Sequence, residues 1–170
     1  MTPPPQIPSA DAPNSRTLNA RLTADHGEIE GLFRDARMAL ERDLQAEAHT
    51  VVDRIWMRLA VHIRAEHKVV FPALVEVRPD LQSVLQALHE DHDYFMSALA
   101  GAVKAMKGPS PEVALIRAAL EAVGLRLDSH NAIEEETIYP AADELPREQR
   151  LQVLEDVSRE LAFLPIRHGR

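Results

Sequence analysis

Cysteine is absent from this chain of 170 residues. Disulfide bonds, zinc–thiolate sites and a cysteine nucleophile are therefore excluded, and any bound metal ion must be held by nitrogen and oxygen ligands. Glycine and aromatic side chains are scarce, with six Gly, four Phe, two Tyr and one Trp. Alanine and leucine are abundant instead, and this composition favours helices over strands.

Basic residues are outnumbered, because 27 Asp and Glu stand against 19 Lys and Arg and give a formal net charge of −8. This negative charge argues against nucleic acid or an anionic membrane surface as a partner. The length fits a single domain, and a hydrophobic content of 45% is typical of a globular protein. We expect a monomer or a homodimer.

The first fifteen residues, MTPPPQIPSADAPNS, lack both a basic residue and an apolar run. They match neither a signal peptide nor a membrane anchor. Their five prolines predict a disordered leader over residues 1–15 of a cytoplasmic protein.

Beyond the leader, long proline-free stretches carry apolar residues at helical spacing. Four such helices are predicted, at about residues 17–43, 45–71, 81–107 and 110–140. Ser110 and Pro111 are expected to start the fourth, and Pro72 and Pro140 to end the second and the fourth. The four stripes comprise Leu18, Leu22, His26, Ile29, Phe33, Ala36 and Leu40; Val52, Ile55, Leu59, His62, Glu66 and Val70; Leu85, Leu88, His92, Phe95, Leu99, Ala102 and Met106; and Ile116, Leu120, Val123, Leu127, His130, Glu134 and Ile138.

These stretches predict an all-α protein, an antiparallel up-down four-helix bundle over residues 16–141. Short connections between long amphipathic helices favour antiparallel neighbours. A C-terminal segment, residues 142–170, is expected to hold a short fifth helix at about 147–162 and a tail. That helix would present to the bundle the apolar residues Leu151, Leu154, Val157 and Leu161.

Each of the four stripes carries a histidine where leucine is expected, and two carry a glutamate one turn later. A lone histidine on an apolar face is usually a packed, hydrogen-bonded residue, but an unpaired carboxylate in a helical core costs several kcal/mol. A bound cation would satisfy all of these groups at once. The candidate metal ligands are His26, His62, Glu66, His92, His130 and Glu134.

An internal repeat relates the two halves of the chain. The first half reads Asp25-His26, then His62-x-x-x-Glu66, then Phe71-Pro72, and the second reads Asp91-His92, then His130-x-x-x-Glu134, then Tyr139-Pro140. The i, i+4 spacing puts His and Glu on one helical face, so both can reach one centre. Two such half-sites predict a two-metal site with carboxylates free to bridge.

The segments HIRAEHKVVFP and HNAIEEETIYP, with DHDYF around His92, resemble the hemerythrin and HHE cation-binding domains over about residues 17–140. The resemblance implies a hemerythrin-like bundle with a non-haem di-iron centre, for which manganese or zinc are possible substitutes. In that centre one iron would be held by His26 and His62, the other by His92 and His130, with Glu66 and Glu134 as bridges. It also implies binding of O2 or a related small molecule such as NO, for sensing, storage or delivery.

The chain departs from oxygen-carrying hemerythrins at one position. Those proteins add a histidine one turn before the residue that matches His92, and this chain has Leu88 there. The adjacent His89 is either a substitute fifth histidine ligand, an outer group or a surface residue. Without that ligand both metals keep room for exogenous ligands, which favours sensing or redox chemistry over reversible oxygen carriage.

Other polar residues near the motifs have simpler interpretations. His67 stands where the family often has a second acid, and we expect it at the bundle edge or as an outer group. Tyr139 is interpreted as a packing residue, and Glu135 and Glu136 as part of a solvated face.

Two alternative functions stay open, and with them whether the chain is an enzyme. One is a redox enzyme that reduces peroxide or NO, or helps to repair iron–sulfur clusters. The other is metal storage or regulation without a redox role. The ferritin-like di-iron proteins, which carry Glu-x-x-His on two helices, are disfavoured because no histidine here follows a glutamate by three residues.

Overall fold

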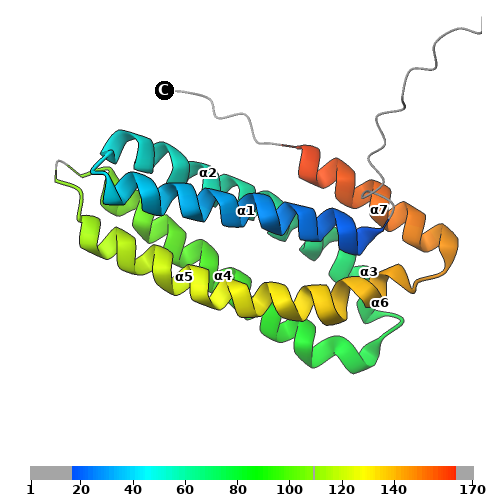
Figure 1. Ribbon diagram of the computed structural model, residues 1–170. Helices are drawn as coiled ribbons and strands as arrows, with labels where there is room; N and C mark the ends of the chain where they lie inside the picture. Colours follow the sequence, from blue (N-terminus) through cyan, green and yellow to red (C-terminus); the bar gives the residue numbers. More distant parts are fainter. Residues whose placement is uncertain (1–16, 109, 164–170) are drawn as a thin grey trace, which may run out of the picture.

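The structure is a computed structural model that describes residues 17–108 and 110–163. The leader predicted over residues 1–15 and the last part of the tail lie outside this range. The described residues form helices and connections without a strand, so the predicted all-α class is confirmed. Long helices lie side by side as a bundle (Figure 1).

The first helix, α1 (Leu18–Glu41), is capped twice at its start. The Thr17 hydroxyl accepts a hydrogen bond from the Ala20 N–H at 3.1 Å, as helix-capping threonines do. The carboxylate of Asp143, distant in sequence, accepts from the N–H groups of Leu18 and Asn19 at 2.8 and 3.1 Å. This second cap ties the beginning of α1 to a residue 125 positions later in the sequence.

Two of the long helices are interrupted by a π-helical segment before their C-terminal end. Helix α2 (Gln45–Ala65) continues through η2 (Glu66–Val70) into α3 (Phe71–Val75), and α5 (Val113–Ile133) continues through η4 (Glu134–Ile138) into α6 (Tyr139–Asp143). Each segment begins at a candidate glutamate, whose carbonyl accepts from the N–H five residues later, that of Phe71 or Tyr139. Such π turns are rare and occur frequently at functional sites.

The predicted helix ends at the prolines are wrong. Pro72 and Pro140 both lie in the first turn of a further helical segment, α3 or α6. Each follows a π segment, which shifts the hydrogen-bond register, and a proline in a first helical turn costs little. The start of α5 also differs, because Glu112 has a non-helical ψ of 73° and the helix begins after it, not at Ser110.

The remaining elements complete the bundle. A short 3-10 helix, η3 (Pro79–Leu81), leads into α4 (Gln82–Met106). Helix α4 packs against α2 and α5, and α1 packs against the same two helices. The last helix, α7 (Arg147–Ala162), is present where the sequence predicts it and lies against α2.

Helix α7 buries part of the predicted stripe, Val157 and Leu161, and Leu154 packs partly buried against the core. Its buried residues are Val153, Val157 and Leu161, whereas Leu151 is 51% exposed. The stripe therefore follows a strict i, i+4 spacing. Its C-terminal end is held by Arg64, which donates to Glu160 Oε2 at 2.7 Å and to the Phe163 carbonyl at 3.0 Å.

All residues of the four predicted stripes are buried, so the predicted core is confirmed. The core divides into two apolar clusters, one containing Ile29, Leu59, Phe95 and Leu127 and the other Leu22, Val70, Leu88 and Ile138. The candidate histidines lie along the helices between these two clusters. The polar groups therefore occupy the middle of the bundle, with apolar packing towards both ends.

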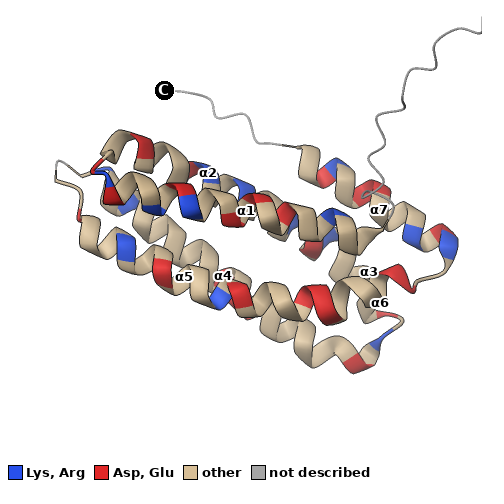
Figure 2. Cartoon of the chain, viewed as in Figure 1, with Lys and Arg blue, Asp and Glu red and all other residues tan. Residues whose placement is uncertain are grey.

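Charges of both signs are interspersed along the helices in Figure 2. In the part of the chain that the structure describes, no helix combines the length and apolar character required to cross a membrane.

Candidate metal centre

The six candidate ligands come together in the interior of the bundle. They are buried, each with at most 2% of its surface exposed: His26, His62, Glu66, His92, His130 and Glu134. One comes from α1, one from α2, one from α4 and one from α5, and each glutamate opens one of the π segments.

The four imidazoles form two pairs. In the first pair, His26 and His62, the Nε2 atoms lie 3.1 Å apart. In the second pair, His92 and His130, the Nε2 atoms lie 3.0 Å apart. In each pair, two nitrogen atoms thus point at one place. The two pairs are the same as those that the resemblance assigns to one iron each.

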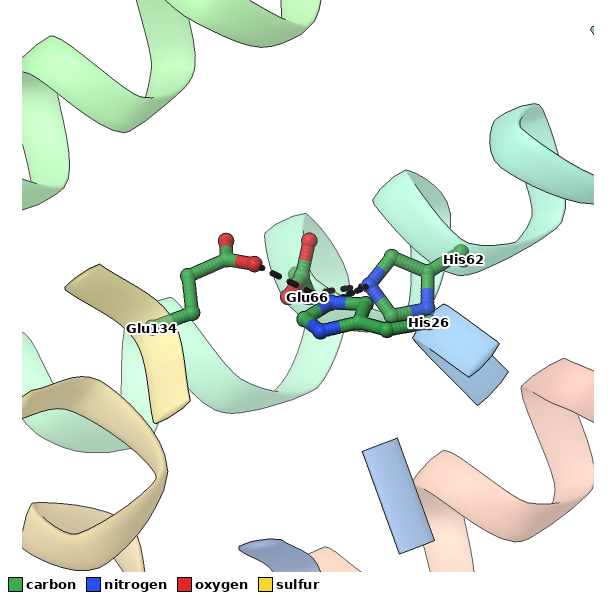
Figure 3. A group of neighbouring side chains, drawn as sticks. All are labelled: His26, His62, Glu66 and Glu134. Carbon is green, nitrogen blue, oxygen red and sulfur yellow. Dashed lines mark hydrogen bonds and ion pairs between the residues drawn. The ribbon is translucent and has the colours of Figure 1, made fainter. Parts of the chain in front are cut away.

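Each glutamate spans the two pairs. Glu66 places Oε1 3.3 Å from His62 Nε2 and Oε2 3.3 Å from His92 Nε2. Glu134 places Oε2 3.3 Å from His26 Nε2 and Oε1 3.0 Å from His130 Nε2. Figure 3 shows the two carboxylates reaching the first pair from different helices. A carboxylate that touches both pairs has the geometry of a bridging ligand.

These residues fit a metal ion by the chemistry of their donor atoms. Glu66 Oε2 and Glu134 Oε1 are buried and have no hydrogen-bond partner. A buried carboxylate oxygen without a partner is costly, and a cation supplies that partner. Ligand atoms of the first pair and both glutamates lie within 4.8 Å of one another, as do those of the second pair and Glu134.

Two Asp–Arg pairs support the centre from outside. With Nε2 turned inwards, Nδ1 of His62 donates to Asp25 at 2.8 Å, and Nδ1 of His130 donates to Asp91 at 3.1 Å. Asp25 also contacts the guanidinium of Arg58, and Asp91 accepts from Arg126 Nε at 2.7 Å. Such outer carboxylates fix the orientation of a metal-binding imidazole and raise its basicity.

These supporting residues were not predicted from the sequence, although the repeat contains a signal for them. Both Asp residues directly precede a candidate histidine. Both Arg residues stand four positions before the next one, so that each half reads Arg-x-x-x-His-x-x-x-Glu: Arg58-His62-Glu66 and Arg126-His130-Glu134.

The remaining two histidines are supported by the residues that follow the glutamates. Nδ1 of His26 donates to Glu135 at 2.7 Å, and Nδ1 of His92 lies 2.7 Å from Nε2 of His67. The interpretation of Glu135 as part of a solvated face is incomplete, because its side chain, although 34% exposed, also accepts a hydrogen bond from His26 on α1. Of the two open interpretations of His67, the structure favours the outer group.

His89 lies away from the six ligands. It is exposed, and its ring stacks on His67 with 3.8 Å between centroids and 4° between planes. Leu88 is buried in the apolar cluster beside the centre. His89 thus contacts a residue that contacts a ligand.

Tyr139 reaches the centre with its hydroxyl group. The hydroxyl donates to Glu66 Oε1 at 2.6 Å, and it lies 3.0 Å from Glu134 Oε2 and 2.9 Å from His26 Nε2. The interpretation of Tyr139 as a packing residue is incomplete, since its ring packs while its hydroxyl faces the ligands. At the equivalent position of the repeat the first half has Phe71, which has no such group.

The carboxylates and imidazoles perturb one another strongly. Burial opposes the charged form of His62 and of Glu66, but their attraction outweighs it, so the pKa of His62 is raised and that of Glu66 lies well below its usual range. The same balance raises the pKa of His130 and lowers that of Glu134. Burial and the two carboxylates raise the pKa of Tyr139 well above its usual value, so the phenol keeps its proton. Burial, with His92 and His89 nearby, lowers the pKa of His67 to about 4.

Comparison with known proteins gives one match. The family model described as the hemerythrin HHE cation-binding domain matches residues 17–142. No curated protein and no solved structure matches the chain significantly.

Proposed function

Since this chain belongs to the hemerythrin HHE cation-binding domain family, we propose that it is a non-haem di-iron protein that binds O2 or a related small molecule such as NO. The role we assign to it is sensing, storage or delivery of that molecule. One observation carries the proposal: each of the two buried glutamates contacts a histidine of the first pair and a histidine of the second pair. This arrangement suits two ions that share their carboxylates.

The donor set supports iron. Each pair offers two imidazoles and shares carboxylate oxygens, and two histidines with a carboxylate are the ligands of many non-haem iron sites with open positions. Manganese and zinc accept the same atoms and are the substitutes to test. The ligands in this proposal are His26, His62, Glu66, His92, His130 and Glu134.

The surroundings of the histidines suit a small uncharged ligand. Bound iron would supply open coordination positions and electrons for a diatomic molecule. The other side chains beside the four imidazoles are Ile29, Leu59, Leu127 and Asn131, and they enclose a space too narrow for a water molecule. Three apolar walls and one amide exclude charged solutes better than gases.

The bundle itself is proposed to be the antiparallel up-down type over residues 16–141. The support is that consecutive long helices are joined by short connections and that α1 and α4 each pack against α2 and α5. That packing places each ligand-bearing helix next to two others, as a shared central site requires.

The test is anaerobic reconstitution of metal-free protein with ferrous iron, followed by elemental analysis and optical spectra under O2, NO and peroxide. We expect two ions per chain and a spectral change on gas exposure that reverses on removal of the gas. His130→Ala should lose one ion, whereas His49→Ala, near the start of α2, should keep both. One ion or none per chain in the unaltered protein would overturn the di-iron proposal, and catalytic consumption of peroxide or NO would replace binding by enzymatic turnover.

A further inference from the structure

The internal repeat makes the residue after each bridging glutamate a pair for comparison. Glu134 is followed by Glu135, and Glu66 is followed by His67. Both residues make the equivalent contact: each lies at hydrogen-bond distance, 2.7 Å, from Nδ1 of a histidine in the other half of the repeat. The positions are equivalent, but the acceptors differ: a carboxylate supports His26 and an imidazole supports His92.

The difference changes the charge around the two histidine pairs. The first pair, His26 and His62, rests on the carboxylates of Glu135 and Asp25. The second pair, His92 and His130, rests on one carboxylate, Asp91, and on the ring of His67. Each Asp has an Arg partner in both halves, and the additional partner of Arg58, Glu28, is 66% exposed. The first pair is left with one more negative charge in its support than the second.

The acceptor of the Nδ1 proton affects how well Nε2 binds a cation. A carboxylate attracts that proton strongly and makes the imidazole a better donor of its other lone pair. An imidazole nitrogen that accepts the same hydrogen bond is neutral, since a doubly protonated ring has no free lone pair. It therefore orients His92 but adds no charge.

The ring of His67 also contacts the exposed His89 on the solvent side. The ring of His67 stacks on that of His89, with 3.8 Å between their centroids, and its centroid lies 4.9 Å from that of His92. The exposed His89, the half-buried His67 and the buried His92 thus contact one another in succession. His67 is the neutral group that accepts the hydrogen bond from Nδ1 of His92.

We propose that His67 is a positioning residue for His92 that makes the second histidine pair bind its metal ion more weakly than the first, so that the two halves of the centre load in order. This inference rests on the proposed metal-binding function. Outer partners of this kind typically change metal affinity about 10–100-fold, and we expect the two binding steps to differ by about that factor.

Cobalt(II) is the probe, because its visible spectrum reports binding without redox chemistry. Metal-free protein is titrated with cobalt(II) against a competing chelator for the two affinities, and a parallel titration with diamagnetic zinc(II), followed by NMR of 15N-labelled histidine, shows which rings respond first. In the unaltered protein His26 and His62 should respond at the first equivalent, and His92 and His130 only at the second.

Three variants isolate the contribution of the acceptor. His67→Glu installs the acceptor that Glu135 already provides, and it should strengthen the weaker step about tenfold or more so that all four rings respond together. Glu135→Gln removes the carboxylate from the first pair and should weaken the stronger step by a similar factor. His89→Leu leaves the hydrogen bond between His67 and His92 in place and should preserve the order. Tyr139, a further difference between the halves, is unchanged in all three.

The outcomes separate this inference from the proposed function. Binding of two cobalt ions with equal affinity and simultaneous response of all four rings would overturn the loading order and leave the two-metal site intact. Failure to bind two ions would overturn the proposed function itself. If circular dichroism shows that His67→Glu does not fold, Glu135→Gln decides, and an unchanged first affinity in that variant would refute the role of the acceptor.

Discussion

Replacing Asp25 by Asn should destabilise the metal-free protein far more than the same change at Asp91. Both carboxylates accept from Nδ1 of a histidine and pair with an arginine, so the two positions are chemically matched. They differ in burial. Asp25 is fully buried and Asp91 is 19% exposed, while their partners Arg58 and Arg126 are 18% and 46% exposed.

The expected magnitudes follow from that burial. Removing one partner of a buried ion pair costs about 3–5 kcal/mol. Asparagine keeps one oxygen, and Arg58 retains Glu28 at 3.1 Å, so we expect about 2–3 kcal/mol for Asp25→Asn. An exposed pair contributes about 0–1 kcal/mol, and Asp91→Asn should cost about 1 kcal/mol. For a protein of this size the melting temperature should fall by roughly 5–10 °C in the first variant and about 2–4 °C in the second.

The assay is thermal unfolding of both metal-free variants, followed by far-UV circular dichroism. Metal affinity is measured in parallel, and there both variants should lose about 10–100-fold because both substitutions remove the negative charge from the group that accepts a ligand's Nδ1 proton. Equal losses of stability would refute the argument from burial. Unchanged metal affinity in both variants would refute the assigned role of the aspartates.

Three further predictions concern protonation, the last helix and the exposed histidine. The pKa values of His62 and His130 are raised in the metal-free fold, so their contribution to stability is full below the unfolded value of about 6.5 and is lost as pH rises through the folded values. Metal-free protein should therefore melt at a lower temperature at about pH 8.5 than at about pH 6.5, and loaded protein should do the reverse because protons compete with metal. Arg64→Ala should speed hydrogen exchange in α7 and leave that of α4 unchanged, since Arg64 binds the end of α7 alone. His89→Leu should keep both metal ions and His92→Leu should not; loss of an ion in the former, by elemental analysis, would make His89 a ligand.

Much of this architecture could be predicted from the sequence because a helix repeats every 3.6 residues. The four stripes, from Leu18 to Ile138, are buried as predicted. The histidines and glutamates were recognisable because they interrupt those stripes, and a carboxylate such as Glu66 is out of place in a core unless something binds it. Periodicity and the cost of burying charge are properties of the chain itself, and no tertiary information was needed to apply them.

The prolines show a limit of local rules. Proline lacks an N–H, and Pro72 and Pro140 were therefore expected to end their helices. The structure places a π segment just before each, and the chain continues as helix. In both halves of the sequence a glutamate stands six residues before the proline, Glu66 before Pro72 and Glu134 before Pro140. Local propensity does not show that the turn between them widens.

Contacts between helices were decided by the tertiary structure alone. The period of a helix tells which residues share a face, but it does not tell which residue of a neighbouring helix lies opposite. From the sequence, Glu135 therefore looked like part of a solvated face, Tyr139 like packing, and His67 like either an edge residue or an outer group. The packing of the bundle sets Glu135 against His26, His67 against His92 and the hydroxyl of Tyr139 against His26. The axial offset and rotation of the packed helices determine these pairings, because they depend on how whole side-chain surfaces interdigitate. The sequence by itself determined which residues face the core, and the packing determined what each of them touches.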